Sequence, residues 1–431
     1  MWIKYGVGLL LLCGIFTVPG QALTLTEAME AGLANSHALK EASYGTEMNR
    51  FKRESAESAF MPKVTTRYGY SQTNRGGDAG RDSSTAGVEV SLNLFNGLTD
   101  YNTYRSADSG YKARQFEEQG LVEDFKLSVI KAYIGVLSAE KALAVSTQAV
   151  AQLESQLATT RLSFKVGLLP KNDVLKVTSR TVAARRKVLE SKSNVRVAAF
   201  NLEKVTGLSL EATEVFDDFS DQPSGSPDYA RLETMMEENR SELKYLATLL
   251  EARGYAVDAA KGSWLPSVDL SAGWTSYGDS GIPDGRSYGY NDDTVVQANL
   301  RWTLFDGTAR RSRLNIASSE AAQLREKLRE TKLTLNTHLK TAFERYRVAG
   351  ESYKAAHSEV DSARENYRVT EAMVKASSAT TTDLLDANLI LTRAENSRNE
   401  ARYTMYKAMA EMERAVEAPL FFDNGKGFFY P

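Results

Sequence analysis

The sequence predicts a mainly α-helical protein with a membrane β-barrel portion, and three observations lead to this fold class. The turn Leu94-Phe95-Asn96-Gly97 recurs 210 positions later as Leu304-Phe305-Asp306-Gly307. Each turn follows a segment in which apolar and polar residues alternate, as in a half-buried strand. Each turn also precedes a very long segment with helical periodicity. The chain is therefore predicted to be internally duplicated, with helix, strand, loop, strand, long helix, turn and helix occurring twice.

The amino terminus has the pattern of a secretory signal peptide, predicted to span residues 1–22. Lys4 supplies the positive start, Val7 to Val18 is apolar, and Gly20-Gln21-Ala22 is a small-x-small cleavage site. Cys13, the only cysteine, lies within this segment. A lipoprotein anchored at Cys13 is the alternative, but the bulky Leu12 before it disfavours lipidation. The mature chain is thus expected to be exported and free of disulfides.

The composition argues against several classes of function. The 431 residues carry a net charge of −2 with 25% charged residues, which does not suggest a nucleic-acid binder. The three histidines His37, His338 and His357 are far apart, and no zinc motif or phosphate-binding glycine loop is present. We therefore expect no enzyme activity, no cofactor and no metal site.

Two segments have heptad seams that predict helices of about 65 residues, each on the order of 100 Å long. The seams lie at the same register in the two copies, 210 positions apart. The first seam is Val122, Val129, Val136, Leu143, Val150 and Leu157, with Phe125, Ala132, Ala139, Ser146 and Leu153 three residues on. The second is Leu339, Tyr346, Tyr353, Val360, Tyr367 and Val374, with Ala342, Ala349, Ala356 and Ala363. Each long helix is expected to turn back into a helix of about 35 residues, forming an antiparallel hairpin.

Four segments alternate with period two over about ten residues each and predict two strand pairs. Their apolar positions are Val64, Thr66, Tyr68 and Tyr70; Val88, Val90, Leu92 and Leu94; Val268, Leu270, Ala272 and Trp274; and Val296, Ala298, Leu300, Trp302 and Leu304. The duplication divides the mature chain into a first structural repeat, 23–222, and a second, 223–431. The segment Phe216 to Asp228 is expected to be an irregular link.

Four strands cannot close a barrel, and an open sheet edge in lipid leaves backbone groups unpaired. If the apolar faces meet lipid, several copies must pool their strands, while the polar helices project into water. A passive conduit is the hypothesis that follows. A trimeric coiled-coil surface fibre without transport is the alternative, although a fibre would not need two hairpin returns. A secreted enzyme is a third hypothesis, for which no site is found.

The motifs in their duplicated order resemble the TolC-like outer-membrane factors, an outer membrane efflux protein family. The resemblance rests on both Leu-Phe-Asn/Asp-Gly turns, Val166-Gly167-Leu168, the stretch Asp383 to Ala387, and the start Leu23 to Leu39. It implies a homotrimer whose twelve-stranded barrel in the outer membrane of a Gram-negative bacterium continues into a periplasmic α-barrel. It also implies efflux or type I secretion with a periplasmic adaptor (a membrane fusion protein) and an inner-membrane transporter. The cargo, whether drug, metal or protein, stays open.

The resemblance also implies site residues at the hairpin turns. Asp383 and Asp386, with Asp173 at the matching place in the first hairpin, are expected to form a periplasmic gate of carboxylate rings. A structural interpretation makes Asp383 the N-cap of its helix. Val166, Gly167 and Leu168 are expected at the tip that contacts the adaptor, although a helix C-cap alone would explain Gly167. Where the family has a tyrosine and an arginine that lock the entrance, this chain has Val374 and Ala379.

The strand-to-helix turns at Asn96, Gly97, Asp306 and Gly307 are predicted to be structural, because glycine allows a sharp turn without steric strain. Five aromatic residues have two open interpretations: an aromatic girdle at a membrane surface, or ordinary packing. These are Tyr68, Tyr70, Trp274, Tyr277 and Trp302.

Overall fold

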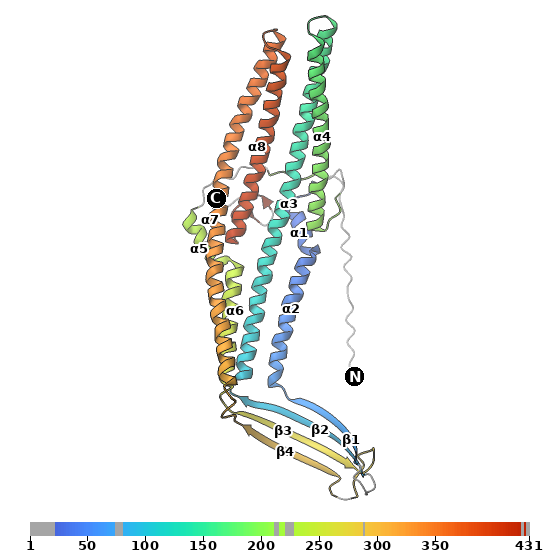
Figure 1. The fold of residues 1–431 in the computed structure, drawn as a ribbon, viewed down its shortest axis with the longest axis vertical. Helices are drawn as coiled ribbons and strands as arrows, with labels where there is room; N and C mark the ends of the chain where they lie inside the picture. The colour runs from blue at the N-terminus through green and yellow to red at the C-terminus, as the bar shows by residue number, and fades with distance from the viewer. Residues whose placement is uncertain are drawn as a thin grey trace.

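The computed structural model is a long, narrow molecule with upright helices above a curved four-stranded sheet (Figure 1). It describes residues 22–73, 81–210, 215–219, 228–287, 289–423 and 426–427. Residues 1–21 of the expected signal peptide, including Cys13, lie outside this part of the chain, and so does the expected boundary between residues 222 and 223. The division into repeats at that boundary stays a prediction.

Two helices of 67 residues run the length of the helical body. They are α3 (Thr99–Lys165) and α7 (Ala309–Lys375), and their bounds are 210 positions apart. The expected seams face inward: Val129, Val136 and Leu157 of α3 are buried, and so are Leu339 and Val360 of α7. All four seam alanines of α7, Ala342, Ala349, Ala356 and Ala363, are also buried. The small residues allow the neighbouring helix to approach closely.

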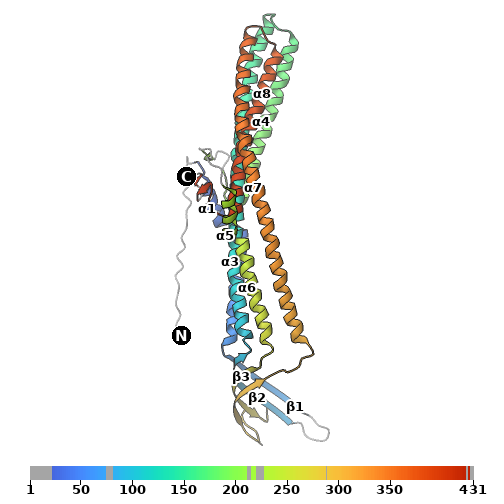
Figure 2. The ribbon, with the colours of Figure 1, turned by 90° about the vertical axis from the view of Figure 1, so that its left-hand side faces the viewer.

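The long helices turn back into α4 (Lys171–Thr206) and α8 (Thr381–Val416), both of 36 residues. Below them lie α1 (Leu25–Asn35), α2 (His37–Glu57), the short 3₁₀ turn η1 (Ser58–Phe60), α5 (Tyr229–Asn239) and α6 (Ser241–Gly262). In the upper half the order across the molecule is α4, α3, α8, α7 (Figure 1), and these helices overlap in the view turned by 90° (Figure 2). No helix among these described residues is both long and apolar enough to cross a membrane.

A four-stranded antiparallel sheet lies below the helices, in the order β1-β2-β3-β4. The strands are β1 (Lys63–Thr73), β2 (Arg81–Asn96), β3 (Ser267–Gly278) and β4 (Asp292–Arg301). Directly opposite residues share a face, and the register pairs Val64 with Val90, Val88 with Trp274, and Ala272 with Val296. The apolar positions predicted separately for the four strands therefore form one continuous face.

This apolar face is exposed to solvent in the single chain. Val64, Tyr68, Val90, Trp274, Val296 and Leu300 all belong to it and are all exposed. Among the described residues β1 pairs only with β2, and β4 only with β3, so each outer strand keeps a free edge. Exposed apolar sheet faces of this kind are rare on monomeric soluble proteins, and free edge strands can pair with further strands.

The predicted strand bounds need two corrections. A bulge between Asn93 and Phe95 leaves Leu94 without a partner, and Phe95 instead pairs with Val268. β4 ends at Arg301, so Trp302 and Leu304 lie beyond the sheet. Trp302 instead donates its indole N–H to the carbonyl oxygen of Trp264 at 3.1 Å, which holds the chain at the corner below α6.

The main core lies at the waist of the molecule, where residues 215–219 pack against α3 and α8. Tyr133 of α3 is buried there, and its hydroxyl donates to the carbonyls of Leu23 and Asp217 at 2.8 and 2.7 Å. Leu23 and Phe216 form a parallel bridge. Burial raises the pKa of the Tyr133 phenol, so the phenol stays protonated and its single hydrogen is shared between the two carbonyls. A further small pair, β5 (Phe422–Asp423) and β6 (Lys426–Gly427), follows α8.

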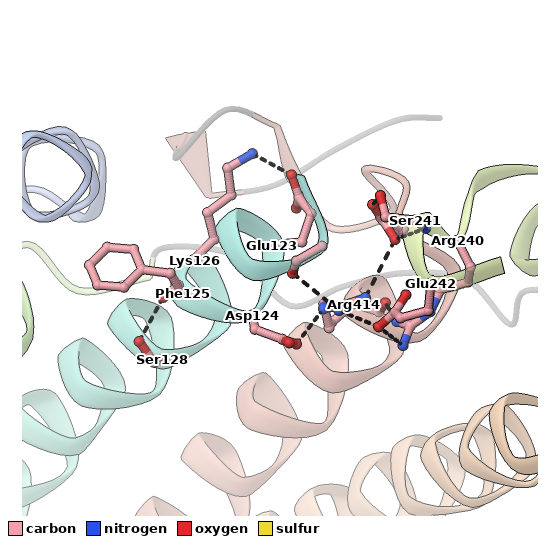
Figure 3. Close-up of polar contacts among 11 residues, drawn as sticks. Glu123, Asp124, Phe125, Lys126, Ser128, Arg240, Ser241, Glu242 and Arg414 are labelled. Carbon is pink, nitrogen blue, oxygen red and sulfur yellow. Dashed lines mark hydrogen bonds and ion pairs between the residues drawn. The ribbon is translucent and has the colours of Figure 1, made fainter. Parts of the chain in front are cut away.

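The carboxyl end of α8 meets the amino end of α6 in a cluster of buried charges, the Arg414 cluster (Figure 3). The Arg414 guanidinium contacts Asp124 of α3 at 2.7 Å, Glu242 of α6 at 2.8 Å and Glu417 at 3.5 Å. Glu417 in turn accepts a hydrogen bond from the backbone N–H of Ser241 at 2.8 Å, which caps α6. The cluster thus fastens α8 and α6 end to end against α3.

The corresponding joint in the first half is uncharged. Asn35, the last residue of α1, donates its side-chain amide to the carbonyl oxygen of Thr206 at 3.3 Å, where the end of α4 meets the junction of α1 and α2. Gly207 ends α4 with φ +70°. The predicted fold class is confirmed in its helical hairpins, its four strands and its duplication, while the two joints show that the halves are not chemically equivalent.

Candidate functional site at the hairpin tips

The second hairpin tip begins α8 with a capping box. The N-cap is Thr380, whose hydroxyl accepts from the Asp383 N–H at 3.2 Å. The Asp383 carboxylate accepts from the Thr380 N–H at 2.8 Å and from its hydroxyl at 2.7 Å. The interpretation of Asp383 as the N-cap is therefore wrong: Asp383 stands three residues inside the helix, because a threonine already fills the cap.

The capping box sets the charge of this tip. Hydrogen bonds from the backbone N–H and the hydroxyl of Thr380 stabilise the carboxylate and lower the pKa of Asp383. Asp386 lies one turn further on the same helix; it is exposed and forms no ion pair within the described part of the chain. The tip therefore presents the Asp383 carboxylate, held ionised at neutral pH, with the Asp386 side chain three residues further along the helix.

The first hairpin tip places Asp173 at the equivalent position of α4, three residues after the N-cap Pro170. Proline has no side chain that could cap, so Asp173 instead lies 3.7 Å from the Lys176 ammonium. That ammonium also donates to the Thr382 hydroxyl of the second hairpin at 3.2 Å. Lys176 thus joins the two tips. Sequence reasoning missed it, although its spacing of three from Asp173 was a usable signal.

Deeper contacts hold the hairpins together below the tips. Leu385 of α8 is buried against Leu153 and Leu157 of α3 and Val177 of α4. The Asn388 side chain donates to the Gln152 side chain at 2.8 Å. Neither contact could be predicted from one segment alone, because each depends on how two segments more than 200 residues apart are aligned.

Val166, Gly167 and Leu168 form the carboxyl end of α3 and its return. Gly167 has φ +82°, and the N–H of Leu168 donates to the carbonyl of Ser163 at 2.8 Å. This is the Schellman arrangement, which satisfies the last carbonyls of the helix. It directs Val166 and Leu168 outward, and Leu168 is 77% exposed. The tip therefore presents apolar side chains to solvent.

The second hairpin uses the same return without glycine. Ser377 takes the place of Gly167 with φ +56°, and the Ser378 N–H donates to the Met373 carbonyl at 2.8 Å. Val374 and Ala379 flank this return and are half-buried. Neither side chain can donate or accept a hydrogen bond, so neither can make a side-chain hydrogen bond at this tip.

The strand-to-helix turns have matching geometry in both halves. Gly97 and Gly307 have φ +71° and +67°, and the following Leu98 and Thr308 are left-handed as well. The side chains of Asn96 and Asp306 each accept a hydrogen bond from the N–H four residues on, at 3.2 and 3.0 Å. These two polar residues thus cap the long helices, a role that the repeated turn had not indicated.

Metal chemistry has no support in the geometry. Within the residues that the structure describes, no group of three or more histidine, cysteine, aspartate or glutamate side chains could hold a metal ion. Asp173 and Asp383 lie in the first turns of their helices, and Asp386 lies one turn further along α8.

Comparison with known proteins places this architecture. AprF of Pseudomonas aeruginosa, an alkaline protease secretion protein, is 24% identical over 411 residues, covering 91% of this chain and 84% of AprF. Protein CyaE of Bordetella pertussis is 25% identical over 346 residues, covering 78% of this chain and 71% of CyaE.

Solved structures share the fold at low sequence identity. The channel protein CusC superposes with a TM-score of 0.82 at 12% identity, covering 92% of both chains. The Campylobacter jejuni outer membrane channel CmeC superposes with a TM-score of 0.81 at 17% identity, covering 91% of this chain and 85% of CmeC. The outer membrane efflux protein family model matches residues 29–208 and 234–416, and the family consists of transport channels rather than enzymes. The chain belongs to the outer membrane efflux protein family.

Proposed function

We propose that this protein is the outer-membrane channel of a tripartite efflux or type I secretion system, a passive conduit across the periplasm and the outer membrane. It is energised elsewhere, by an inner-membrane transporter that a periplasmic adaptor connects to the hairpin tips. The single observation that carries the proposal is the sheet: four strands present one exposed apolar face and keep two free edges. Such a sheet is a fragment of a lipid-facing wall.

The assembly follows from the same feature. Three copies supply twelve strands, and closing them into a barrel removes every free edge. The helices are too polar for lipid. They extend from the barrel into the periplasm and form the water-filled tube there. The hairpin returns at Gly167 and Ser377 disfavour the fibre alternative, because a fibre needs one uninterrupted coil.

The entrance of this tube lies at the hairpin tips. Asp383 and Asp386 of three copies form carboxylate rings, with Asp173 beside them, and these rings attract cations and narrow the opening. Val166, Gly167 and Leu168 offer the adaptor an apolar contact outside the rings. The absence of an enzyme activity belongs to the same proposal, since the chain's carboxylates act as caps, ion pairs and gate.

Single-channel recording in a planar bilayer tests the proposal. The purified protein is expected to pass a small current, and Asp383→Ala with Asp386→Ala is expected to raise the conductance several-fold. The change removes the carboxylate rings and also frees the first turn of α8. Asp361→Ala, an exposed aspartate of α7 away from the tips, is the matched control and should conduct like the unaltered protein. Absence of current from every form would rule the conduit out.

A further inference from the structure

A cavity of about 490 Å³ lies between the two hairpins, and we call it the interhairpin cavity. Its floor is α3, because α4 and α8 both pack along α3 from either side but have little contact with each other (Figure 1). Small side chains leave the space open, among them Ala142 and Ala149 of α3 and Ala183 of α4. The volume is in the range of ordinary small-molecule sites.

Two contacts align the three helices around this cavity. Arg185 of α4 contacts Glu154 of α3 at 2.6 Å. Asn388 of α8 donates its side-chain amide to the side chain of Gln152 of α3 at 2.8 Å. Lys187 of α4 and Asn388 therefore lie at about the same height, on opposite walls in the middle of the cavity.

The two ends of the interhairpin cavity differ in polarity. Toward the hairpin tips it is lined by Leu153 of α3 and Leu385 of α8, which are buried. Toward the waist it is lined by Ser146 of α3, Ser191 of α4 and Asn396 of α8. A molecule that fits along the cavity therefore needs one apolar end and one polar end.

The charged residues that line the cavity are two cations, Arg180 and Lys187 of α4. Arg180 is exposed and forms no ion pair within the described part of the chain. Lys187 contacts Glu190 at 3.3 Å, but Glu190 also contacts Arg186 at 3.8 Å and does not line the cavity. Because no carboxylate of the described residues lines it, the charge of the cavity favours an anion.

A buried hydroxyl at the polar end is free to bind a ligand. Ser191 is only 4% exposed, and its hydroxyl makes no hydrogen bond with any described residue. The Ser146 hydroxyl, by contrast, donates to the carbonyl of Leu143 at 2.9 Å. Buried polar groups normally have a hydrogen-bond partner. Lys187 lies one helical turn from Ser191 on the same face of α4, so both side chains can reach one ligand group.

We propose that the interhairpin cavity binds an amphiphilic anion, such as a medium-chain alkyl carboxylate. The carboxylate accepts hydrogen bonds from the Lys187 ammonium and the Ser191 hydroxyl, and the alkyl chain runs toward the tips along Leu153 and Leu385. Burial of the alkyl chain drives binding, and the hydrogen bonds to the charged group fix its orientation. The proposal concerns a cavity within one chain and does not rest on the conduit proposed above.

A helix of a partner protein is the alternative occupant. An α-helix with its side chains is about 10 Å across, so roughly one turn would already fill the cavity. A compact molecule with a single anionic group fits this volume better, and it uses both the Lys187 ammonium and the Ser191 hydroxyl. A partner helix or a second copy of this chain would instead shield the cavity before any small molecule is added.

Protection of a cysteine tests the proposal. Ala183→Cys places a thiol on the wall of the cavity, in a chain whose Cys13 is replaced by serine. N-Ethylmaleimide modifies this thiol in the purified protein, held in lipid nanodiscs, and the rate is measured at increasing concentrations of decanoate. Decanoate is expected to slow the reaction several-fold and to reach saturation. Ser362→Cys, on α7 and outside the cavity, is the control thiol and should react equally fast with and without decanoate.

Variants of the two proposed donors test the position of the carboxylate. Lys187→Gln and Ser191→Ala should each raise the half-protecting concentration of decanoate about tenfold, the loss expected for a hydrogen bond to a charged group. Arg186→Gln is the matched control, because Arg186 contacts the same Glu190 but does not line the cavity. It should leave the half-protecting concentration unchanged. Decylammonium, with the same chain and the opposite charge, should protect the thiol only weakly.

Several results would overturn the anion site. These are the absence of protection by decanoate, equal protection by decanoate and decylammonium, and equal effects of Lys187→Gln and Arg186→Gln. If the thiol of Ala183→Cys reacts much more slowly than that of Ser362→Cys before decanoate is added, a partner helix or a second copy covers the cavity, and the proposal is wrong as well. None of these results depends on conductance, so the conduit is tested independently.

Discussion

Single residues determine the two corners where strand becomes helix, and Gly97 and Gly307 show how differently equivalent residues can be constrained. Both have positive φ, where a side chain is strained. A Cβ at Gly97 would also lie 2.0 Å from the carbonyl oxygen of Gly262, whereas a Cβ at Gly307 would meet nothing within 4 Å. The first corner is therefore closed by a backbone contact with α6, and the second is open.

We predict that Gly97→Ala destabilises the protein far more than Gly307→Ala. Gly307→Ala should cost about 1–2 kcal/mol, the strain of a left-handed residue. Gly97→Ala adds the displacement of the Gly262 backbone to the same strain. Thermal unfolding followed by circular dichroism compares the two variants, and equal melting temperatures would contradict the prediction.

The capping box at Thr380 predicts a pH dependence for the start of α8. The pKa of Asp383 in the folded chain is below its ordinary value, so the stabilisation is complete above that ordinary value, about pH 4. It is lost as the pH falls further, through the folded-state pKa. Hydrogen exchange of residues 381–387, corrected for intrinsic rates, should show constant protection from pH 7 to 5 and a loss below pH 4.

Asp383→Asn is the control for this experiment, because an amide removes the charged acceptor at every pH. In this variant the hydrogen-exchange protection of residues 381–387 should be low and should stay the same between pH 7 and pH 3. Loss of protection in the unaltered protein between pH 7 and 5 would show that another group controls the turn.

Among the elements, the joint between α8 and α6 differs most from its counterpart between α4 and α2. Arg414 has a side chain only 7% exposed and holds carboxylates from three segments, whereas Lys204, 210 positions earlier, is exposed. Burial and the adjacent Arg414 lower the pKa of Arg240, which donates to Glu242 at 2.8 Å. The joint depends on pairing every buried charge.

We predict that Arg414→Met costs about 3–5 kcal/mol, because it leaves the buried carboxylate of Glu417 without its cation, while Glu242 keeps only its contact with Arg240. Lys204→Met at the equivalent place in α4 should change stability by no more than about 0.5 kcal/mol. Urea unfolding of the two variants measures the difference. Similar values for both would mean that the cluster contributes no more than an exposed charge.

At the scale of the whole molecule, the hydrophobic periodicity of the sequence predicted the helices and strands. It could not predict which of these elements contact one another. The heptad seams predicted α3 and α7 because burial of one helix face leaves a local pattern. The pairing of β2 with β3, the tie from Lys176 to Thr382 and the Arg414 cluster join segments far apart in the chain. No local pattern encodes such contacts, and the reciprocal hydrogen bonds of Asp383 with the N-cap Thr380 and the role of Asn96 as a cap became clear only from the structure.

The continuity of α3 and α7 has a consequence for reach. The returning helices α4 and α8 end at the waist, and other helices continue toward the sheet from there. The long helices α3 and α7 are instead continuous over 67 residues, about 100 Å. The distance that the protein can bridge is thus set by the number of residues in α3 and in α7. Deleting one heptad from α3 alone would shorten the first hairpin by about 10 Å, so that the tip of the second hairpin would extend beyond it. A homologue that bridges a wider compartment must lengthen both helices by the same whole number of heptads.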